Sequence, residues 1–231
     1  MGARQGSGQL LKLLEQSDAD VIALQEVSPW FCEQLSKQDW FKKYHGTMKN
    51  GKLIAVGGLL IISKNKIVAV AAARLNAGRQ GRALLTIDTH IGKIPVTVAT
   101  CHLESFLQAG PTRALQIKQF MLSLAGKKHV VFMGDFNFGD GEAEVSAIEK
   151  SYVDAWTQLH KKLPGLTWNM ELSQMAKLGA FKTEKSRRLD RIFIKSPSLK
   201  PIQIKIIGNQ PIPGSKTIFP SDHFGLECVV E

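Results

Sequence analysis

Several polar side chains stand directly after apolar runs of the sequence, where a strand would give way to a loop. Glu26 closes the segment VIALQE, His102 ends VTVATCH, and Asp135 and Asn137 lie in MGDFNFGD directly after VVF. Strand ends aim side chains from rigid elements into one cleft, which is where functional residues gather. Carboxylates, an imidazole and a carboxamide at such positions can hold a hard metal ion and move protons.

The pair Asp135 and Asn137 has a spacing that brings side chains together. Residues at i and i+2 of an extended segment face the same side, so the two side chains would converge on one point. A hydrogen-bonded turn next to Gly134 is the structural alternative. Taken alone, Glu26 is equally well explained as a solvated acid at a strand end, and a single histidine such as His102 is more often structural than catalytic.

Two further polar groups lie in the C-terminal third of the chain. Asp190 stands in RRLDRIFIK, and Ser221-Asp222-His223 precedes the apolar run FGLECVV. An acid that holds a cation donor suits phosphoryl chemistry, because the cation can stabilise charge on phosphate oxygens. An ion pair between Asp190 and a neighbouring arginine, and a turn or helix cap at Asp222 and His223, are the structural alternatives.

Strands interspersed with helices must position these residues. The leucine spacing of 8–16 and the apolar face of 112–124 predict helices. Adjacent strand-like runs suggest hairpins, so we expect an α/β fold of two packed mixed β-sheets flanked by helices, which fits better than a doubly wound parallel sheet. The expected strands are 21–24, 53–63, 66–73, 82–90, 95–101, 129–134, 189–195 and 224–230.

The composition is that of a globular chain. It has 231 residues, 44% hydrophobic and 22% charged, and no repeat or linker divides it, so we expect a single domain, 1–231. No apolar run reaches the roughly 18 residues that cross a bilayer, and the first residues lack the apolar stretch of a secretory signal. We therefore expect an intracellular protein with no membrane partner. Cys32, Cys101 and Cys228 are widely spaced in apolar sequence, which indicates buried thiols and excludes a disulfide framework or a thiolate zinc site.

The net charge of +10 is concentrated in one stretch. Between Lys161 and Lys205, eleven Lys or Arg residues oppose three acids, so this stretch carries +8. One interpretation is a solvated face. The other is a polyanionic partner, because Lys and Arg that neutralise backbone phosphates release condensed counterions. On the second interpretation, Arg187 and Arg188 contact nucleic-acid phosphates.

The order and spacing of the polar segments carry more information than any one of them. LQEV is followed by CHLES, GDFN, LDRIF and SDHFGL, over about residues 9–230. This set resembles the endonuclease/exonuclease/phosphatase superfamily, whose DNase-like fold is a four-layer α/β/β/α sandwich. Within it, the chain is most similar to the 5′-tyrosyl-DNA phosphodiesterases, through Gly81-Arg82, Ser105 in CHLES, Leu166-Thr-Trp168 and FPSDHFGL.

The resemblance implies a metal-dependent phosphodiesterase that uses Mg²⁺, with Mn²⁺ as an alternative ion. Glu26 fits the role of metal ligand, since Mg²⁺ takes one or two carboxylates and keeps most of its waters. By the resemblance, Asp135 positions and deprotonates the nucleophilic water, and Asn137 orients that site. Asp222 would hold His223 and reach the metal through water.

The resemblance also implies contacts to the phosphate and to the leaving group. His102 and His223 would stabilise the pentacoordinate phosphate. An indole and a guanidinium suit a phosphotyrosyl substrate through stacking and cation–π contact, although a core Trp168 and a surface Arg82 are structural alternatives. The substrate-binding residues implied in this way are Arg82, Ser105, Trp168 and Asp190.

The substrate implied is DNA with a protein or peptide joined through tyrosine to its 5′ end. A monomer would act on it in DNA repair, in the nucleus or the cytoplasm. Another nuclease or a phosphatase of the same fold is one alternative function, and a catalytically impaired, nucleic-acid-binding truncated form is another.

Two positions depart from the pattern of the family that the chain resembles. That family begins with a strand ending in N-x-D-G-L, whose Asn helps to bind metal and phosphate, and no Asn precedes Asn50 here. We therefore expect a domain that is N-terminally incomplete and lacks its first strand. Gly139 stands where the similar phosphodiesterases usually have an arginine, so one phosphate contact is missing.

Overall fold

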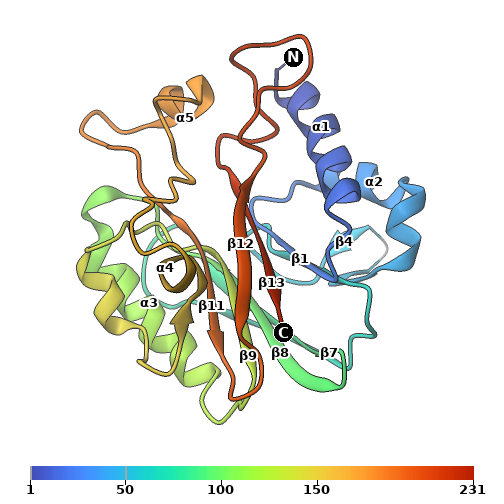
Figure 1. Ribbon diagram of the computed structural model, residues 1–231, viewed down its shortest axis with the longest axis vertical. Coiled ribbons are helices and arrows are strands. Elements are labelled where there is room, and N and C mark those ends of the chain that lie inside the picture. The colour runs from blue at the N-terminus through green and yellow to red at the C-terminus, as the bar shows by residue number, and fades with distance from the viewer. Residues whose placement is uncertain (1, 50) are drawn as a thin grey trace.

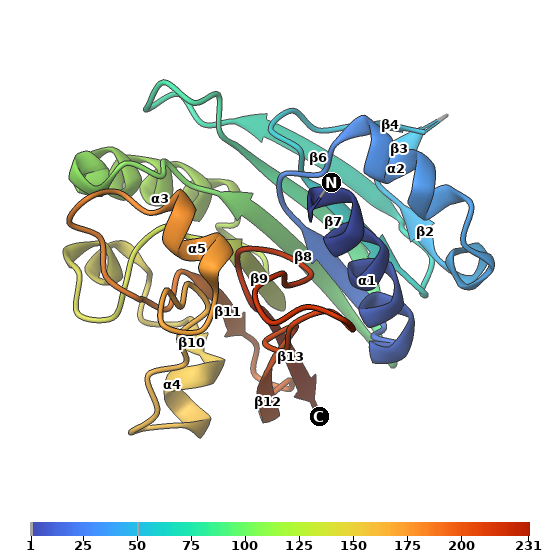
Figure 2. The same ribbon diagram turned by 90° about the horizontal axis from the view of Figure 1, so that it is seen from above.

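Two layers of β-structure pack against each other, and helices cover their outer sides. The computed structural model describes residues 2–49 and 51–231, with side chains from residue 6 onward. In Figures 1 and 2, α1 (Gly2–Ser17) and α2 (Pro29–Ser36) lie on one side of the β-structure and α3 (Gly110–Ser123) lies on the other. The expected α/β class, with packed sheets and flanking helices, is confirmed, and among the described strands the parallel pairing that makes a sheet mixed lies in the first layer.

A six-stranded sheet forms the first layer. Its order is β10-β11-β9-β8-β7-β6, and every pairing is antiparallel except that of β8 with β9. A parallel pair needs a crossover, which α3 supplies between these two strands. The strands are β6 (Ala69–Arg74), β7 (Ala83–Ile91), β8 (Ile94–His102), β9 (Val130–Asp135), β10 (Val153–Asp154) and β11 (Asp190–Lys195).

The second layer consists of shorter sheets that are not hydrogen-bonded to one another. One is three-stranded in the order β1-β5-β2, and the other pairs β12 with β13. A small hairpin of β3 and β4 adjoins them. The strands are β1 (Val21–Leu24), β2 (His45–Gly46), β3 (Met48–Lys49), β4 (Lys52–Leu53), β5 (Leu60–Ser63), β12 (Pro201–Ile207) and β13 (Gly225–Val230).

One hydrophobic core joins both parts of the second layer to the first. Leu85, Val98 and Ile192 of the six-stranded sheet belong to the same cluster as Ile61 of β5 and Ile204 of β12. Burying side chains of this size removes a large apolar area from water, worth about 1.5–3 kcal/mol each. The small sheets are therefore held in one layer by packing, although no strand pairing connects them.

Two further cores hold the helices. Ile117 and Phe120 of α3 pack with Phe132 of β9, and Leu11 of α1 packs with Ile62 of β5. In α2 the N-cap Ser28 accepts a hydrogen bond from the Phe31 amide, and Pro29 occupies the first turn, where its missing N–H costs nothing. The remaining helices are the short α4 (Ala155–Leu159) and α5 (Gln174–Gly179) and the 3₁₀ turns η1 (Asp39–Lys43), η2 (Leu107–Ala109) and η3 (Ala143–Ala147).

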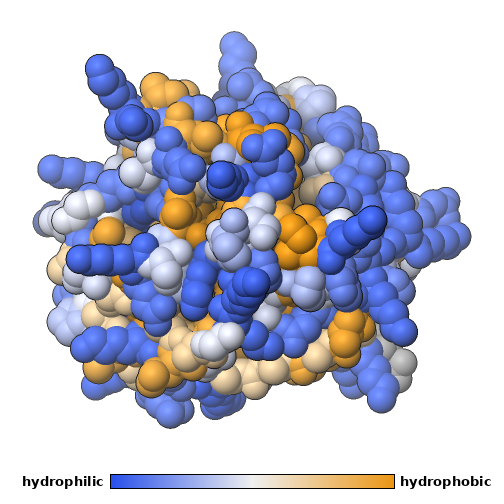
Figure 3. Space-filling view, turned by 60° about the horizontal axis from the view of Figure 1, so that its bottom comes forward, coloured by the Kyte–Doolittle hydropathy of each residue, from blue (hydrophilic) through white to orange (hydrophobic). Residues whose placement is uncertain are grey.

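The exterior has the mixed character usual for a globular domain. Leu122, Leu178 and Val68 are exposed in different parts of the chain, and on the face in Figure 3 hydrophobic side chains lie among hydrophilic ones. None of the helices in the described residues is long and apolar enough to cross a membrane. Cys32 and Cys101 are buried free thiols as expected, whereas Cys228 is only half-buried.

Candidate active site

Strand register places three of the expected site residues side by side. His102 at the end of β8 pairs in register with Asp135 at the end of β9, and Asp135 pairs with Asp190 at the start of β11. Gly134 makes the close approach of β9 to β8 feasible, since a Cβ there would lie 2.3 Å from the Cys101 carbonyl oxygen. The fold therefore aligns these residues at one edge of the six-stranded sheet.

Asp135 and Asn137 form a closed hydrogen-bonded unit after β9. The Asn137 amide N–H donates to Asp135 Oδ1 at 2.9 Å, and Asn137 Nδ2 donates to Asp135 Oδ2 at 3.2 Å and to the Leu103 carbonyl at 3.0 Å. Asn137 has a φ of 53°, a left-handed conformation in which Asn is among the better tolerated side chains. The two side chains converge as expected. The same hydrogen bonds also form the turn that was the structural alternative, so the two descriptions are compatible.

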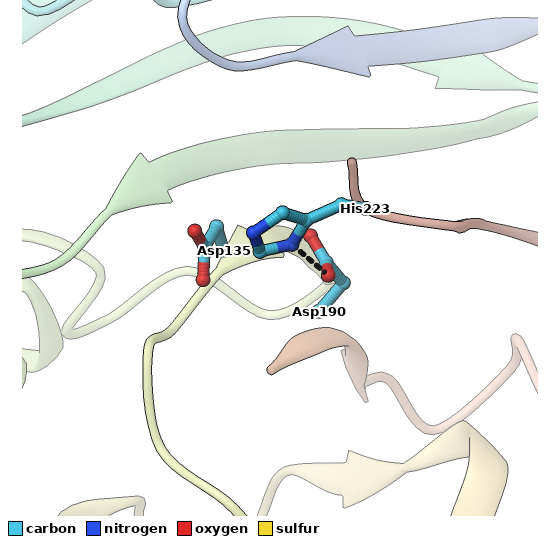
Figure 4. A group of neighbouring side chains, drawn as sticks. All are labelled: Asp135, Asp190 and His223. Atoms are coloured by element: carbon cyan, nitrogen blue, oxygen red, sulfur yellow. Dashed lines mark hydrogen bonds and ion pairs between the residues drawn. The ribbon is translucent and has the colours of Figure 1, made fainter. Parts of the chain in front are cut away.

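A charged network links His223 to both aspartates. His223 Nδ1 donates to Asp190 Oδ2 at 2.8 Å, and Figure 4 shows the imidazole between Asp190 and Asp135. Burial alone would lower the pKa of His223, but Asp190 and Asp135 outweigh burial and raise the pKa to about 10. His223 is therefore an imidazolium cation at neutral pH, held between two carboxylates.

The protonation state of His223 also determines whether His223 and the two aspartates can bind a metal ion. Ligand atoms of Asp135, Asp190 and His223 all lie within 4.8 Å of one another, close enough to surround an ion. A histidine must be neutral to ligate a metal, however, and His223 is protonated and already donates to Asp190. The arrangement fits an acid–imidazolium–acid network better than a metal centre.

Thr167 positions this network and was not predicted from the sequence. Its Oγ1 accepts hydrogen bonds from the amides of Leu189 and Asp190, each at 3.0 Å, and its carbonyl accepts one from the Phe224 amide at 2.8 Å. Thr167 thus holds the start of β11 and the residue after His223 in one place. A threonine in a loop carries no spacing signal, so only the structure reveals this role.

His102 is neutral, and its neighbours define which nitrogen carries the proton. Burial lowers the pKa of His102 to about 4, although Asp135 opposes the shift. Arg82 Nη1 lies 2.7 Å from His102 Nδ1, and because an arginine can only donate, Nδ1 must be the acceptor. The proton therefore resides on Nε2, which lies 3.3 Å from Asp135 Oδ2.

Glu26 presents an exposed carboxylate beside this group. Its side chain is 77% exposed, and Oε1 lies 3.8 Å from His102 Nδ1. Glu26 has a φ of 55°, and Gly58 packs directly against its backbone, where a Cβ would come within 3.0 Å of the Glu26 Cα. Among the side chains that the structure describes, no Lys or Arg forms an ion pair with Glu26, so this hard oxygen donor fits a hydrated divalent cation.

The other expected residues surround the same place. The Trp168 ring is buried in a cluster with Ala176 and Leu189, as the structural alternative of a core Trp168 expects, and its centroid lies 4.8 Å from that of His223. Arg82 is half-buried and contacts His102, so the alternative of a free surface arginine is wrong. Asp222 is exposed and accepts a hydrogen bond from the Ser221 hydroxyl, while Ser105 is tied to Gln80, a residue that was not predicted.

The basic stretch contains arginines that are not available to phosphates. Arg188 is buried and paired with Asp140 and Asp154, and Arg187 is paired with Glu142 and Glu184. The prediction that both arginines contact nucleic acid is wrong for Arg188, because its guanidinium is already enclosed. For Arg187 the pairs leave little of the side chain exposed. Exposed basic residues in the stretch include Lys161, Lys162, Lys182 and Lys185.

A family model and curated relatives match nearly the whole chain. A family model described as the Endonuclease/Exonuclease/phosphatase family matches residues 2–223. Tyrosyl-DNA phosphodiesterase 2 of Rattus norvegicus is 28% identical over 218 residues, covering 91% of this chain and 58% of the relative. The protein of the same name from Homo sapiens is 27% identical over 218 residues, covering 90% of this chain and 58% of the relative. The chain thus spans little more than half of these relatives.

Solved structures share the fold. A crystal structure of D. rerio TDP2 complexed with single strand DNA product superposes with a TM-score of 0.84 at 23% identity, covering 100% of this chain and 93% of that one. An endonuclease/exonuclease/phosphatase family protein from Leptotrichia buccalis has a TM-score of 0.72 at 22% identity, covering 99% and 93%. These likenesses establish the architecture.

Proposed function

The chain belongs to the endonuclease/exonuclease/phosphatase family, and from that premise we propose that it is a Mg²⁺-dependent phosphodiesterase that hydrolyses 5′-phosphotyrosyl linkages in DNA. The observation that carries this proposal is the in-register row of His102, Asp135 and Asp190 with the His223 cation beside it. The relatives named tyrosyl-DNA phosphodiesterase 2 support the choice of substrate.

The row supplies the groups that hydrolysis needs. Asp135 accepts a proton from water as the water oxygen attacks phosphorus in line, the bond from phosphorus to the tyrosyl oxygen breaks, and DNA with a 5′-phosphate remains. Burial raises the pKa of Asp135, which favours its action as a base. The His223 imidazolium and the Nε2–H of His102 donate to the phosphoryl oxygens, where charge develops. Asp190 keeps His223 oriented and charged.

We assign the metal to Glu26, with Asp222 as a second carboxylate acting through water. The exposed Glu26 carboxylate has the oxygen chemistry and the open surroundings that Mg²⁺ requires, and Mn²⁺ would fit the same donors. When bound there, the ion offsets negative charge on the phosphoryl and leaving oxygens. Trp168, Arg82 and Ser105 border this place and would contact the scissile phosphate and the tyrosyl group.

The proposed role is the repair of protein–DNA adducts by a monomer in the nucleus or the cytoplasm. Exposed lysines of the basic stretch, such as Lys182 and Lys185, support contact with the DNA backbone. A general nuclease of the same fold and a nucleic-acid-binding form without activity remain the alternatives that the experiment must separate.

The deciding experiment uses two oligonucleotides of one sequence, with a 5′-phosphotyrosyl group or a 5′-hydroxyl. We expect Mg²⁺-dependent release of a 5′-phosphate from the first and no cleavage of the second, resolved on a denaturing gel. Asp135→Asn should abolish release, because the base is lost while the size is kept. Cleavage of both oligonucleotides would indicate a general nuclease. Binding without hydrolysis at any Mg²⁺ or Mn²⁺ concentration would indicate the inactive form.

A further inference from the structure

The loop between β6 and β7 borders the active site and is held by glutamine side chains. From α3, Gln119 accepts a hydrogen bond from the Asn76 amide and donates one to the Arg74 carbonyl, both at 2.9 Å. Gln116 donates to the Ala77 carbonyl at 2.8 Å. These two glutamines fix the first half of the loop to the helix and do not bond to any expected site residue in it.

Gln80 in the second half of the loop has different partners. Its Oε1 accepts hydrogen bonds from Arg82 Nη2 at 3.0 Å and from the Ser105 amide at 2.8 Å. Its amide also bonds to the Ser105 hydroxyl, with Nε2 donating at 2.9 Å. One side chain thus connects the loop before β7 to the loop after β8, at two residues that border the reacting groups.

Arg82 depends on Gln80 for its orientation. Its guanidinium bonds to His102 through Nη1 and to Gln80 through Nη2, while Nε is buried without a partner among the described residues. An arginine side chain is flexible, and two bonds at different nitrogens fix the plane of the guanidinium where one bond leaves it free to rotate. Without the Gln80 oxygen, Arg82 would be held at His102 alone.

We propose that Gln80 is a positioning residue of the active site, whose side-chain oxygen orients Arg82 against His102 Nδ1 and thereby keeps the His102 proton on Nε2, facing Asp135. The chain of contacts runs from Gln80 to Arg82 at 3.0 Å, from Arg82 to His102 at 2.7 Å, and from His102 to Asp135 at 3.3 Å. The consequence for catalysis rests on the proposed function, whereas the consequence for the His102 tautomer does not.

The primary test is spectroscopic and uses the protein without added metal. Nitrogen chemical shifts of the imidazole distinguish the two neutral tautomers, and the His102 signals are identified by their loss in His102→Asn. We expect the wild type to show the form protonated at Nε2 and Gln80→Ala to show a mixture of tautomers. Gln80→Glu keeps an accepting oxygen for Arg82 and should restore the wild-type pattern.

Gln119→Ala is the matched control, because it removes a glutamine that holds the same loop without contacting Arg82. It should leave the His102 signals unchanged. On a 5′-phosphotyrosyl oligonucleotide, Gln80→Ala should lower kcat about tenfold, the order expected for one hydrogen bond to a charged group, with Gln119→Ala close to wild type.

Two results would overturn the positioning role. One is an unchanged His102 spectrum in Gln80→Ala. The other is an equal change in Gln80→Ala and Gln119→Ala, which would mean that only the loop's attachment matters. If the wild type hydrolyses no adduct at all, the proposed function fails, and the spectra of the same variants still decide the role of Gln80.

Discussion

At Glu26 the backbone adopts a left-handed conformation that costs of order 1–3 kcal/mol in a residue other than glycine. Such strain persists only where the surroundings impose it. Here the Val27 amide bonds to the Gly58 carbonyl, and the Gly58 backbone lies so close that a side chain at position 58 would clash with Glu26 and Val27. The result is a carboxylate that points into solvent beside His102, which is the arrangement a hydrated metal ion needs.

Replacing Glu26 tests its assignment as the metal ligand. Glu26→Gln keeps the size and removes the charge, so hydrolysis should fall by about 10²–10³ while DNA affinity stays similar. Steady-state rates over a Mg²⁺ titration, with DNA binding measured by anisotropy, provide the readout. Glu33→Gln is the control, since Glu33 is also exposed but pairs only with Lys37 among the described residues. Wild-type activity in Glu26→Gln would remove Glu26 from the mechanism.

The His223 cation predicts a particular dependence of stability on pH. Its pKa is about 10 in the folded protein, above the 6.5 of an ordinary histidine. Between these values the folded state binds more protons than the unfolded state, so the free energy of unfolding decreases as pH rises. The contribution of His223 is therefore complete below about pH 6.5 and is lost on approach to pH 10.

Urea unfolding of the metal-free protein at several pH values measures this effect. We expect the wild type to lose more stability between pH 6.5 and 10 than His223→Gln does, because the variant has no titrating group at this position. His90→Gln, at an exposed position of β7, should follow the wild type. Parallel curves for wild type and His223→Gln would show that His223 is not held as a cation.

At the scale of elements, the buried arginine Arg188 links the loop after β9, β10 and α4 to the segment that leads into β11. It donates to Asp154 at 2.9 Å and to Thr157 at 3.1 Å, and it pairs with Asp140. Arg188→Ala should lower the free energy of unfolding by about 3 kcal/mol, because Asp140 and Asp154 each lose one of the two arginines that pair with them and keep only Arg191. Lys185→Ala, at an exposed site nearby, should change it by less than about 0.5 kcal/mol in urea unfolding. A stable Arg188→Ala protein would contradict the structural role.

The exposed lysines of the same stretch are the ones that can meet DNA. Lys182→Gln and Lys185→Gln should weaken binding about equally for all sequences, because phosphate contacts are independent of the bases. The slope of log affinity against log salt should flatten by about 1 for each lysine that contacts a phosphate. Lys37→Gln at the C-cap of α2, outside the basic stretch, serves as the control for net charge. An unchanged slope would favour the interpretation of the basic stretch as a solvated face without phosphate contacts.

The sequence predicts long buried strands and helices well, because their apolar patterns are local. The ranges 95–101 and 189–195 correspond closely to β8 and β11. It is less reliable where glycines interrupt an apolar run or where a strand begins with proline. The expected strand 53–63 is wrong, since Gly57 and Gly58 both have positive φ and break it between β4 and β5. The strand β12 was missed, although Ile202, Ile204 and Ile206 alternate in it after a leading proline.

The same distinction holds for the site. Each polar strand end could be recognised in the sequence, because a chemically active side chain followed an apolar run. The pairing of His102 with Asp135 could not, since register between strands is a tertiary property. Thr167 and Gln80 lie in loops without periodicity, so the residues that hold the reacting groups escape prediction more readily than the reacting groups themselves.

At the scale of the whole molecule, β1 and β13 of the second layer each have a free edge. Among the described strands, β1 pairs only with β5 and β13 pairs only with β12, although Val21, Ala23, Leu226 and Cys228 line the same core. Unpaired edges with partly buried apolar side chains favour association between molecules. We propose that an additional strand belongs between β1 and β13, as expected from the N-x-D-G-L pattern.

This proposal predicts that the 231-residue chain alone is aggregation-prone and only weakly active. Adding an upstream segment that ends in N-x-D-G-L should increase both the monomeric fraction in size-exclusion chromatography and the turnover of a 5′-phosphotyrosyl oligonucleotide. The matched control carries the same segment with its Asn changed to Ala, which should recover the monomer but not the turnover. A monomeric, cooperatively melting and fully active 231-residue chain would contradict the proposal.

The in-register row of His102, Asp135 and Asp190 has a consequence for how such an enzyme can change. Side chains alternate between the two faces of a strand, so inserting one residue into β9 would turn Asp135 away from both neighbours at once. The loops that carry Gln80 and Ser105 belong to no strand ladder, so an insertion elsewhere in them does not reverse the face of any side chain in the row. Directed evolution toward new leaving groups should therefore accumulate insertions in these loops and leave the lengths of β8, β9 and β11 unchanged.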